Sequence, residues 1–344
     1  MRLTGVLGGT GKTGCAYLVH QLLSQGLETK TALMTTRHSF VLEKKLPPSD
    51  GRGWREALSN VLERAHRVGC DHTVLTLPFD RLLAGEAVDL RLETAVVTGL
   101  RQEDVGPAAD FLQAHATQLV CNLDDPGARR LLSLWQGPCC TYAETRSDAD
   151  VAGRNLRLLP RRTEFDGLTR QELCRIFLPV AGGFDLYQGL AALSWGQLHG
   201  MTLKRCAAVL RHAVGEPGCM ELRQTPDGRE VLSDWGDTPE RLEGLLLAAR
   251  RMTQGKLVLI VAVAPGLSPP QRWELGLRAR LADQVCFTGK EGQPELPAQF
   301  FRELQLGAGD WHSVVCPAYP KALQWGQREA TPMDLLVLAG SHSP

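Results

Sequence analysis

The sequence predicts an α/β protein with a mostly parallel sheet, followed by a second, smaller α/β domain. Short apolar runs alternate with helical patterns along the 344 residues, as is typical of parallel strands covered by helices on both faces. A glycine-rich turn ending in Gly11, Lys12 and Thr13 directly follows the first apolar run. A chain of this length with 43% hydrophobic residues can form two separate cores.

The first domain is expected to span residues 1–216. Helices are predicted at 12–25 and 54–68, and two more at 184–214, separated at Gly200, because apolar residues recur there at helical spacing. Its candidate strands are the apolar runs RLTGVLG, TKTALMTT, HTVLTL, ETAVVTG and TQLVCN.

The second domain is expected to span residues 217–344, after the link sequence GEPG. A hairpin is predicted in CMELRQTPDGREVLSDW, whose PDG sequence favours a turn. An alternating series then follows, with helices expected near 239–253, 270–281 and 297–305. The strands expected between and after them are KLVLIVAVA, QVCFTG and DLLVLAG.

The composition argues against several classes of partner. The 38 basic and 38 acidic side chains balance, and no dense basic run suggests a nucleic-acid groove or an anionic membrane surface. No apolar stretch is long enough to span a bilayer or to serve as a signal peptide. The ten cysteines are scattered, without a C-x-x-C pair, which favours a reducing compartment. We therefore expect a cytoplasmic protein.

The turn GVLGGTGKTG has the composition of a phosphate-binding loop. Its glycines let the backbone approach an anion, Lys12 adds a compact positive charge, and the Thr13 hydroxyl can ligate Mg²⁺. The standard G-x-x-x-x-G-K-[ST] spacing fails, because Val6 stands where the first glycine should be. The alternative is a glycine turn that only packs a helix closely on a strand. The residues predicted to bind a nucleotide here are Gly8, Gly9, Thr10, Gly11, Lys12 and Thr13.

The spacing resembles the loop of the Mur ligase superfamily, G-[IV]-T-G-T-N-G-K-T. Further segments resemble that family in the same order along the chain, and they are most similar to its MurE type, the UDP-N-acetylmuramyl peptide synthetases. They are CNLDDP (121–126), GGFDLYQGLAAL (182–193), EPGCMEL (216–222) and SDWGDTPERLE (233–243). The resemblance implies a P-loop central domain followed by a Rossmann-like C-terminal domain.

The resemblance also implies a reaction. Mur ligases use ATP and Mg²⁺ to phosphorylate a carboxylate, and an amine attacks the acyl phosphate to form an amide. Carried over by position, Lys12 would hold the β- and γ-phosphates and Thr13 a magnesium ion. Asp185 stands where the family has an asparagine near the adenine, and Asp234 where an aspartate of the C-terminal domain approaches the nucleotide.

Several catalytic positions of the family are altered here. Its magnesium-binding glutamate aligns with Thr76, and a neutral hydroxyl is a poor ligand for a hard cation. Asp104 takes the place of a histidine and is predicted to ligate the metal instead. The carbamylated lysine of the family aligns near His115, which is the second predicted catalytic residue beside Lys12. The segments APGLSP and KEGQ replace two further motifs of the C-terminal domain.

The phosphate loop begins within the first ten residues, so we expect the N-terminal UDP-binding domain of MurE enzymes to be missing. The UDP-muramoyl substrate is therefore not carried over. Other relatives that start at the loop, such as folylpolyglutamate synthetases, extend different acceptors.

Two functional interpretations follow. The first is an ATP-dependent carboxylate–amine ligase that acts on small or peptide-like substrates, in cell-wall (peptidoglycan) or peptide-like metabolite synthesis. The second is a catalytically impaired nucleotide-binding pseudoenzyme that regulates or partners an active ligase or amidotransferase. A P-loop ATPase or kinase of another class comes third, because the C-terminal motifs argue against it.

Overall fold

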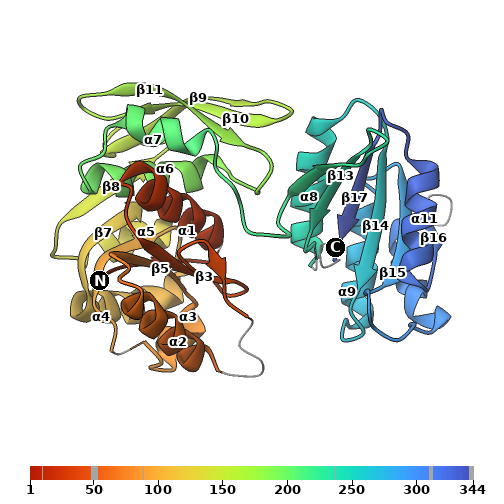
Figure 1. Ribbon diagram of the computed structural model, residues 1–344, viewed down its shortest axis with the longest axis horizontal. Helices are drawn as coiled ribbons and strands as arrows, with labels where there is room; N and C mark the ends of the chain where they lie inside the picture. The colour runs from red at the N-terminus through yellow and green to blue at the C-terminus, as the bar shows by residue number, and fades with distance from the viewer. Residues whose placement is uncertain (10, 48–52, 88, 237, 310–312, 341–344) are drawn as a thin grey trace. The chain divides into compact units, whose positions relative to one another are not determined.

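The computed structural model describes residues 1–9, 11–47, 53–87, 89–236, 238–309 and 313–340. The chain forms two compact units (Figure 1). The first unit contains Met1–Leu158, Arg162–Pro179 and Phe184–Glu216. The second contains Leu159–Arg161, Val180–Gly183 and Pro217–Pro344.

The first unit is built on an 11-stranded sheet in the order β11-β10-β9-β8-β7-β6-β1-β5-β2-β3-β4. Every pairing from β9 to β2 is parallel, whereas β10 and β11 at one end and β3 and β4 at the other pair antiparallel. The predicted mostly parallel sheet is confirmed. Its strands are β1 (Arg2–Leu7), β2 (Thr31–Met34), β3 (Ser39–Val41), β4 (Lys44–Lys45), β5 (His72–Leu77), β6 (Leu92–Val97), β7 (Ala116–Asn122), β8 (Cys139–Ala143), β9 (Val151–Leu158), β10 (Arg162–Leu168) and β11 (Leu173–Pro179).

Helices cover both faces of this sheet because neighbouring strand residues point to opposite sides. Val6 and Val74 pack with α1, α6 and α7, whereas Leu7 and Leu75 pack in a second core with α2, α4 and α5. The helices are α1 (Lys12–Gln21), α2 (Trp54–Arg67), α3 (Phe79–Leu83), α4 (Val105–His115), α5 (Pro126–Leu132), α6 (Leu186–Leu198) and α7 (Leu203–Leu210). α1 continues as a π-helical turn, Leu22–Gly26, and a short 3₁₀ turn, Gln102–Asp104, precedes α4.

The two predicted helices at 184–214 are present, and Gly200 separates them with a φ of 74°. Such a positive φ favours glycine and ends a helix. α6 is buried nearly all round, with Trp195 fully buried. It therefore fills the centre of one core instead of presenting a polar face to solvent.

The second unit contains a six-stranded mixed sheet in the order β12-β13-β17-β14-β15-β16. Only the hairpin of β12 and β13 is antiparallel, as the PDG turn predicted. The strands are β12 (Glu221–Gln224), β13 (Glu230–Asp234), β14 (Leu257–Val263), β15 (Gln284–Gly289), β16 (Ser313–Val315) and β17 (Leu335–Ala339). The helices are α8 (Pro239–Met252), α9 (Pro269–Ala279), α10 (Arg302–Ala308) and α11 (Tyr319–Glu329), with a 3₁₀ turn at Ala298–Phe301.

Each face of the smaller sheet has its own core. α8, α9 and α10 pack on the side of Leu257 and Leu259, whereas α11 packs on the side of Val258 and Ile260. The strongly apolar run of β14 is therefore explained by burial on both faces. Within the described ranges of the chain, no helix combines the length and apolar character required to cross a bilayer.

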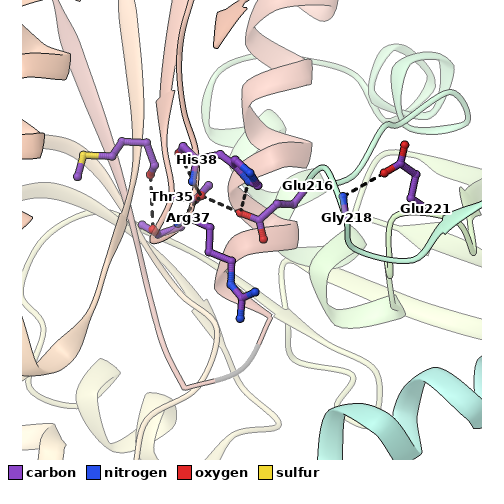
Figure 2. Close-up of polar contacts among 8 residues, drawn as sticks. Thr35, Arg37, His38, Glu216, Gly218 and Glu221 are labelled. Carbon is purple, nitrogen blue, oxygen red and sulfur yellow. Dashed lines mark hydrogen bonds and ion pairs between the residues drawn. The ribbon is translucent and has the colours of Figure 1, made fainter. Parts of the chain in front are cut away.

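Glu216, the last residue of the first unit, is anchored by the turn that follows β2 (Figure 2). Thr35 Oγ1 donates a hydrogen bond of 2.8 Å to Glu216 Oε1, and His38 Nδ1 lies 3.3 Å from the same oxygen. All three side chains are nearly buried. The carboxylate thus ties the end of the first unit to its own sheet before the link to the second unit begins.

Candidate functional site

The candidate site lies at one edge of the large sheet, where four parallel strands end. β1, β5, β6 and β7 run in the same direction, so the loops that follow them meet at their carboxyl ends. These loops line a cavity of about 450 Å³. A crevice at the carboxyl ends of parallel strands is the usual ligand position in open α/β sheets. Its lining residues are Gly8, Gly9, Lys12, Pro78, Phe79, Asp80, Gly99, Leu100, Arg101, Asp104 and Asp125.

The glycine-rich loop connects β1 directly to α1, as a phosphate loop requires. Gly11 has a φ of 75° and stands immediately before α1, and Gly8 has a φ of 145°. Only glycine adopts these backbone conformations without strain. Thr13 is half-buried in the first turn of α1. Thr10, also predicted to bind the nucleotide, lies outside the described residues.

Lys12 is the cation that the loop offers to the cavity. Its Nζ lies 3.4 Å from the carbonyl oxygen of Gly9, to which it donates, and the side chain also lines the cavity. Burial lowers the pKa of Lys12, and the neighbouring Asp80 carboxylate opposes this shift. The ammonium group is therefore near the position where a phosphate would meet the backbone N–H groups at the start of α1.

The predicted metal ligand Asp104 is engaged by an arginine. Its Oδ2 accepts from Arg101 Nε at 2.8 Å and its Oδ1 from Arg101 Nη2 at 3.2 Å. The guanidinium of Arg101 therefore competes with a metal ion for both oxygens of Asp104. Asp104 lines the cavity, as expected.

Thr76 does not replace the glutamate of the Mur ligases. It is almost completely buried at the end of β5, and its hydroxyl donates to the carbonyl oxygen of Met34 at 3.5 Å. No set of three or more histidine, cysteine, aspartate or glutamate side chains within the described ranges is placed to hold a metal ion. Mg²⁺ fits the cavity only in the manner common for nucleotide sites, with one or two carboxylates and the phosphates as ligands.

Asp185 is joined to the phosphate loop through Gln188. It caps α6, since its Oδ1 accepts from the backbone N–H of Gln188 at 2.8 Å, and its Oδ2 accepts from Gln188 Nε2 at 3.2 Å. Burial raises the pKa of Asp185. Gln188 packs so closely on α1 that a methyl group at Gly14 would overlap its Oε1. The sequence did not indicate this contact.

The structure does not bring His115 to the cavity. It is the last residue of α4 and immediately precedes β7, whereas the cavity lies beyond the other end of that strand. A strand of this length spans roughly 20 Å. His115 instead stacks on Phe111 and contacts the guanidinium of Arg91 at 2.8 Å. The predicted catalytic role of His115 depended on a short deletion in the comparison with the family, and the described position of His115 does not support it.

Asp234 lies in the second unit, at the end of β13. Its Oδ2 accepts from the N–H of Met220 at 2.9 Å and its Oδ1 from the N–H of Gly236 at 2.8 Å. Within its unit the carboxylate therefore holds the hairpin and the following turn in place.

Asp125 is a cavity residue to which the sequence assigned no role, although it belongs to the segment CNLDDP. It caps α5, because its Oδ1 accepts from the N–H groups of Ala128 at 2.7 Å and Leu100 at 2.9 Å. The only available signal was the Asp-Pro pair, which favours a helix start.

The fold and the cavity place the chain among α/β proteins that carry a phosphate-type loop on a parallel sheet, with a second α/β unit. Residues 218–342 match the family model described as "Mur ligase, glutamate ligase domain". A relative from Synechococcus elongatus (strain ATCC 33912 / PCC 7942 / FACHB-805), UDP-N-acetylmuramoyl-L-alanyl-D-glutamate--2,6-diaminopimelate ligase, is 29% identical over 99% of this chain and 71% of its own length.

Solved structures agree in fold. One of a UDP-N-acetylmuramoyl-L-alanyl-D-glutamate--2,6-diaminopimelate ligase has a TM-score of 0.74 at 22% identity, covering 99% of this chain and 73% of that one. Mycobacterium tuberculosis folylpolyglutamate synthase, solved with ADP and AMPPCP, has a TM-score of 0.68 at 15% identity. The match covers 99% of this chain and 88% of that one. The chain belongs to the Mur ligase family and is MurE-like.

Proposed function

We propose that this protein is an ATP-dependent carboxylate–amine ligase that acts through an acyl phosphate. The observation that carries the proposal is the cavity in which the glycine-rich loop, Lys12 and the carboxylate of Asp125 meet at the carboxyl edge of the sheet. Family membership supports the reaction class. The acceptor is proposed to be a small or peptide-like carboxylate, and the compartment the cytoplasm.

In this proposal the backbone N–H groups at the start of α1 and the ammonium of Lys12 hold the phosphates of ATP. Thr13, in the first turn of the same helix, lies next to them in sequence and is proposed to contribute its hydroxyl to a magnesium ion. Bound Mg²⁺ supplies charge neutralisation on the transferring phosphoryl group. Asp185 is proposed to support the loop through Gln188, and Asp234 to act from the second unit.

A second candidate is a nucleotide-binding pseudoenzyme that regulates an active ligase. It is favoured by Thr76, whose hydroxyl is turned to a backbone carbonyl, and by Asp104, whose oxygens are bound by Arg101. Each lost charge-stabilising group costs on the order of 10²–10³ in rate. Both candidates share nucleotide binding and differ in turnover.

The experiment is phosphate release from Mg-ATP by the purified protein, supplied with pools of amino acids and peptide-like carboxylates. Lys12→Ala is the catalytic control, and Lys204→Ala, a surface lysine on α7, is the matched control. Substrate-stimulated release that disappears only in Lys12→Ala supports the ligase. Nucleotide binding without stimulated release across the pools favours the pseudoenzyme, and no nucleotide binding by the folded wild type contradicts both.

A further inference from the structure

The cavity at the phosphate loop carries more negative than positive charge. Two of its lining side chains are cationic, Lys12 and Arg101, and three are carboxylates, Asp80, Asp104 and Asp125, which leaves a net charge of −1. A nucleoside triphosphate is itself strongly anionic. A divalent cation between the phosphates and one of these carboxylates would offset the repulsion and allow the two to share the cavity.

Two of the three carboxylates are poorly suited to bind that cation. Both oxygens of Asp104 accept from Arg101. The side chain of Asp80 is 75% exposed and lies 3.4 Å from the guanidinium of Arg81. An exposed, paired carboxylate is neither oriented nor desolvated, so it adds little to a metal site.

Asp125 differs from both in how it is held. Its Oδ1 accepts two backbone N–H groups, from Leu100 and Ala128, which fixes the plane of the carboxylate. Its Oδ2 has no hydrogen-bond partner among the described residues, and a methyl group placed on Gly99 would lie only 3.2 Å from it. Because Gly99 carries no side chain, nothing at that position crowds this oxygen, and both residues line the cavity.

We infer that Asp125, through Oδ2, is the carboxylate that holds the divalent cation of this cavity. The inference rests on the proposed nucleotide site and replaces Asp104 in the metal-binding role that the sequence predicted. Mg²⁺ commonly takes one or two protein carboxylates and completes its shell with phosphate oxygens and water. A single preorganised oxygen is therefore sufficient, although the described residues offer no cage of three protein ligands.

The test measures binding of a fluorescent, nonhydrolysable ATP analogue to the full-length protein, in EDTA and in saturating Mg²⁺. Asp125→Asn keeps a side-chain oxygen for the two N–H groups but removes the anion. With Mg²⁺ we expect its affinity for the analogue to fall about tenfold or more, the usual scale for a disturbed metal site. In EDTA we expect its affinity to equal or exceed that of the wild type, because one repelling charge is gone. A purely structural role of Asp125 would weaken binding in both conditions.

Two variants complete the test. Asp124→Asn is the matched control, because Asp124 also accepts backbone N–H groups, from Glu144 and Thr145, but does not line the cavity. We expect it to leave the effect of Mg²⁺ unchanged. Asp104→Asn is the competing arm. The inference is overturned if Asp104→Asn, and not Asp125→Asn, loses the Mg²⁺ effect, or if Mg²⁺ acts equally on Asp125→Asn and the wild type. If the wild type binds no analogue in either condition, the proposed function fails, and this inference fails with it.

Discussion

Gly8 is the residue at which the phosphate loop depends most on the absence of a side chain. Its φ of 145° disfavours other residues, and a methyl group there would overlap the hydroxyl of Thr98. We expect Gly8→Ala to lower the free energy of unfolding by about 1 to 3 kcal/mol, the usual range for a strained backbone position. Urea denaturation measures this change.

Gly9→Ala is the matched control for this prediction. A methyl group on Gly9 meets no atom within 4 Å, and its φ is not positive. We expect its denaturation midpoint to stay close to that of the wild type. Equal effects of the two substitutions would show that the loop does not have the backbone described.

Two half-buried histidines, His20 and His199, indicate how the stability of the protein depends on pH. Burial lowers the pKa of His20 to about 4, and burial followed by the charge of Arg2 lowers that of His199 to about 4. Each Nε2 lies within 3.0 Å of a threonine hydroxyl, Thr31 or Thr94. A neutral ring can accept such a hydrogen bond at Nε2, whereas a protonated ring cannot.

Both histidines bind protons more readily in the unfolded chain than in the folded protein. Their contribution to the free energy of unfolding is therefore complete above about pH 6.5 and is lost as the pH falls towards 4. The loss is at most about 1.4 kcal/mol per pH unit for each histidine. Urea denaturation between pH 7 and 4 measures it. His20→Gln and His199→Gln should each make the free energy of unfolding less dependent on pH in this range. An unchanged pH dependence in both variants would contradict the prediction.

At the scale of elements, the turn after β2 stabilises the last residue of the first unit, Glu216. Thr35→Val removes the hydroxyl that donates to Glu216 and leaves a nearly buried carboxylate with His38 (Figure 2). An under-satisfied buried acceptor costs about 1 to 3 kcal/mol. We expect that loss in chemical denaturation, together with faster proteolysis at the link after Glu216.

Thr36→Val provides the control for this prediction, since Thr36 is the exposed neighbour of Thr35. Its denaturation midpoint and cleavage rate should match the wild type. If Thr35→Val behaves like Thr36→Val, the hydrogen bond to Glu216 does not stabilise the end of the first unit.

The elements that sequence reasoning found are those with a strong local signal. Gly200 separates α6 from α7, and Thr238 caps α8, accepting from the N–H of Arg241 at 3.4 Å. The antiparallel strands β9, β10 and β11 were not predicted from the sequence. One face of β10 carries Arg162, Glu164 and Asp166, and Arg175 of β11 pairs with the two acids, so no continuous apolar run marks β10.

The candidate site was predictable only in part, for a similar reason. The glycine spacing identifies Lys12 and its loop, because those residues are consecutive in sequence. Asp125 and Gln188 reach the same region from β7 and α6, so only the tertiary fold brings them together. His115 lies before β7, at the opposite end of this strand from the cavity, and its sequence neighbourhood gives no local signal of which end of the sheet it occupies.

At the scale of the whole molecule, the two units have separate cores and should unfold separately. Phe165 is fully buried in a core of the first unit and Phe287 in a core of the second. Replacing either phenylalanine by alanine lowers the free energy of unfolding of the affected unit by about 3 to 5 kcal/mol. In differential scanning calorimetry we expect two transitions, each lowered by one of the two substitutions, because neither cavity touches the other core.

The same experiment links stability to the proposed site. A nonhydrolysable ATP analogue with Mg²⁺ should raise the transition that Phe165→Ala lowers, because a ligand stabilises the unit that binds it. Lys12→Ala should abolish this ligand-induced shift. The transition that Phe287→Ala lowers should stay unchanged in Lys12→Ala. A single transition that both phenylalanine substitutions lower equally would contradict separate unfolding, since the loss of either core would then unfold the whole chain.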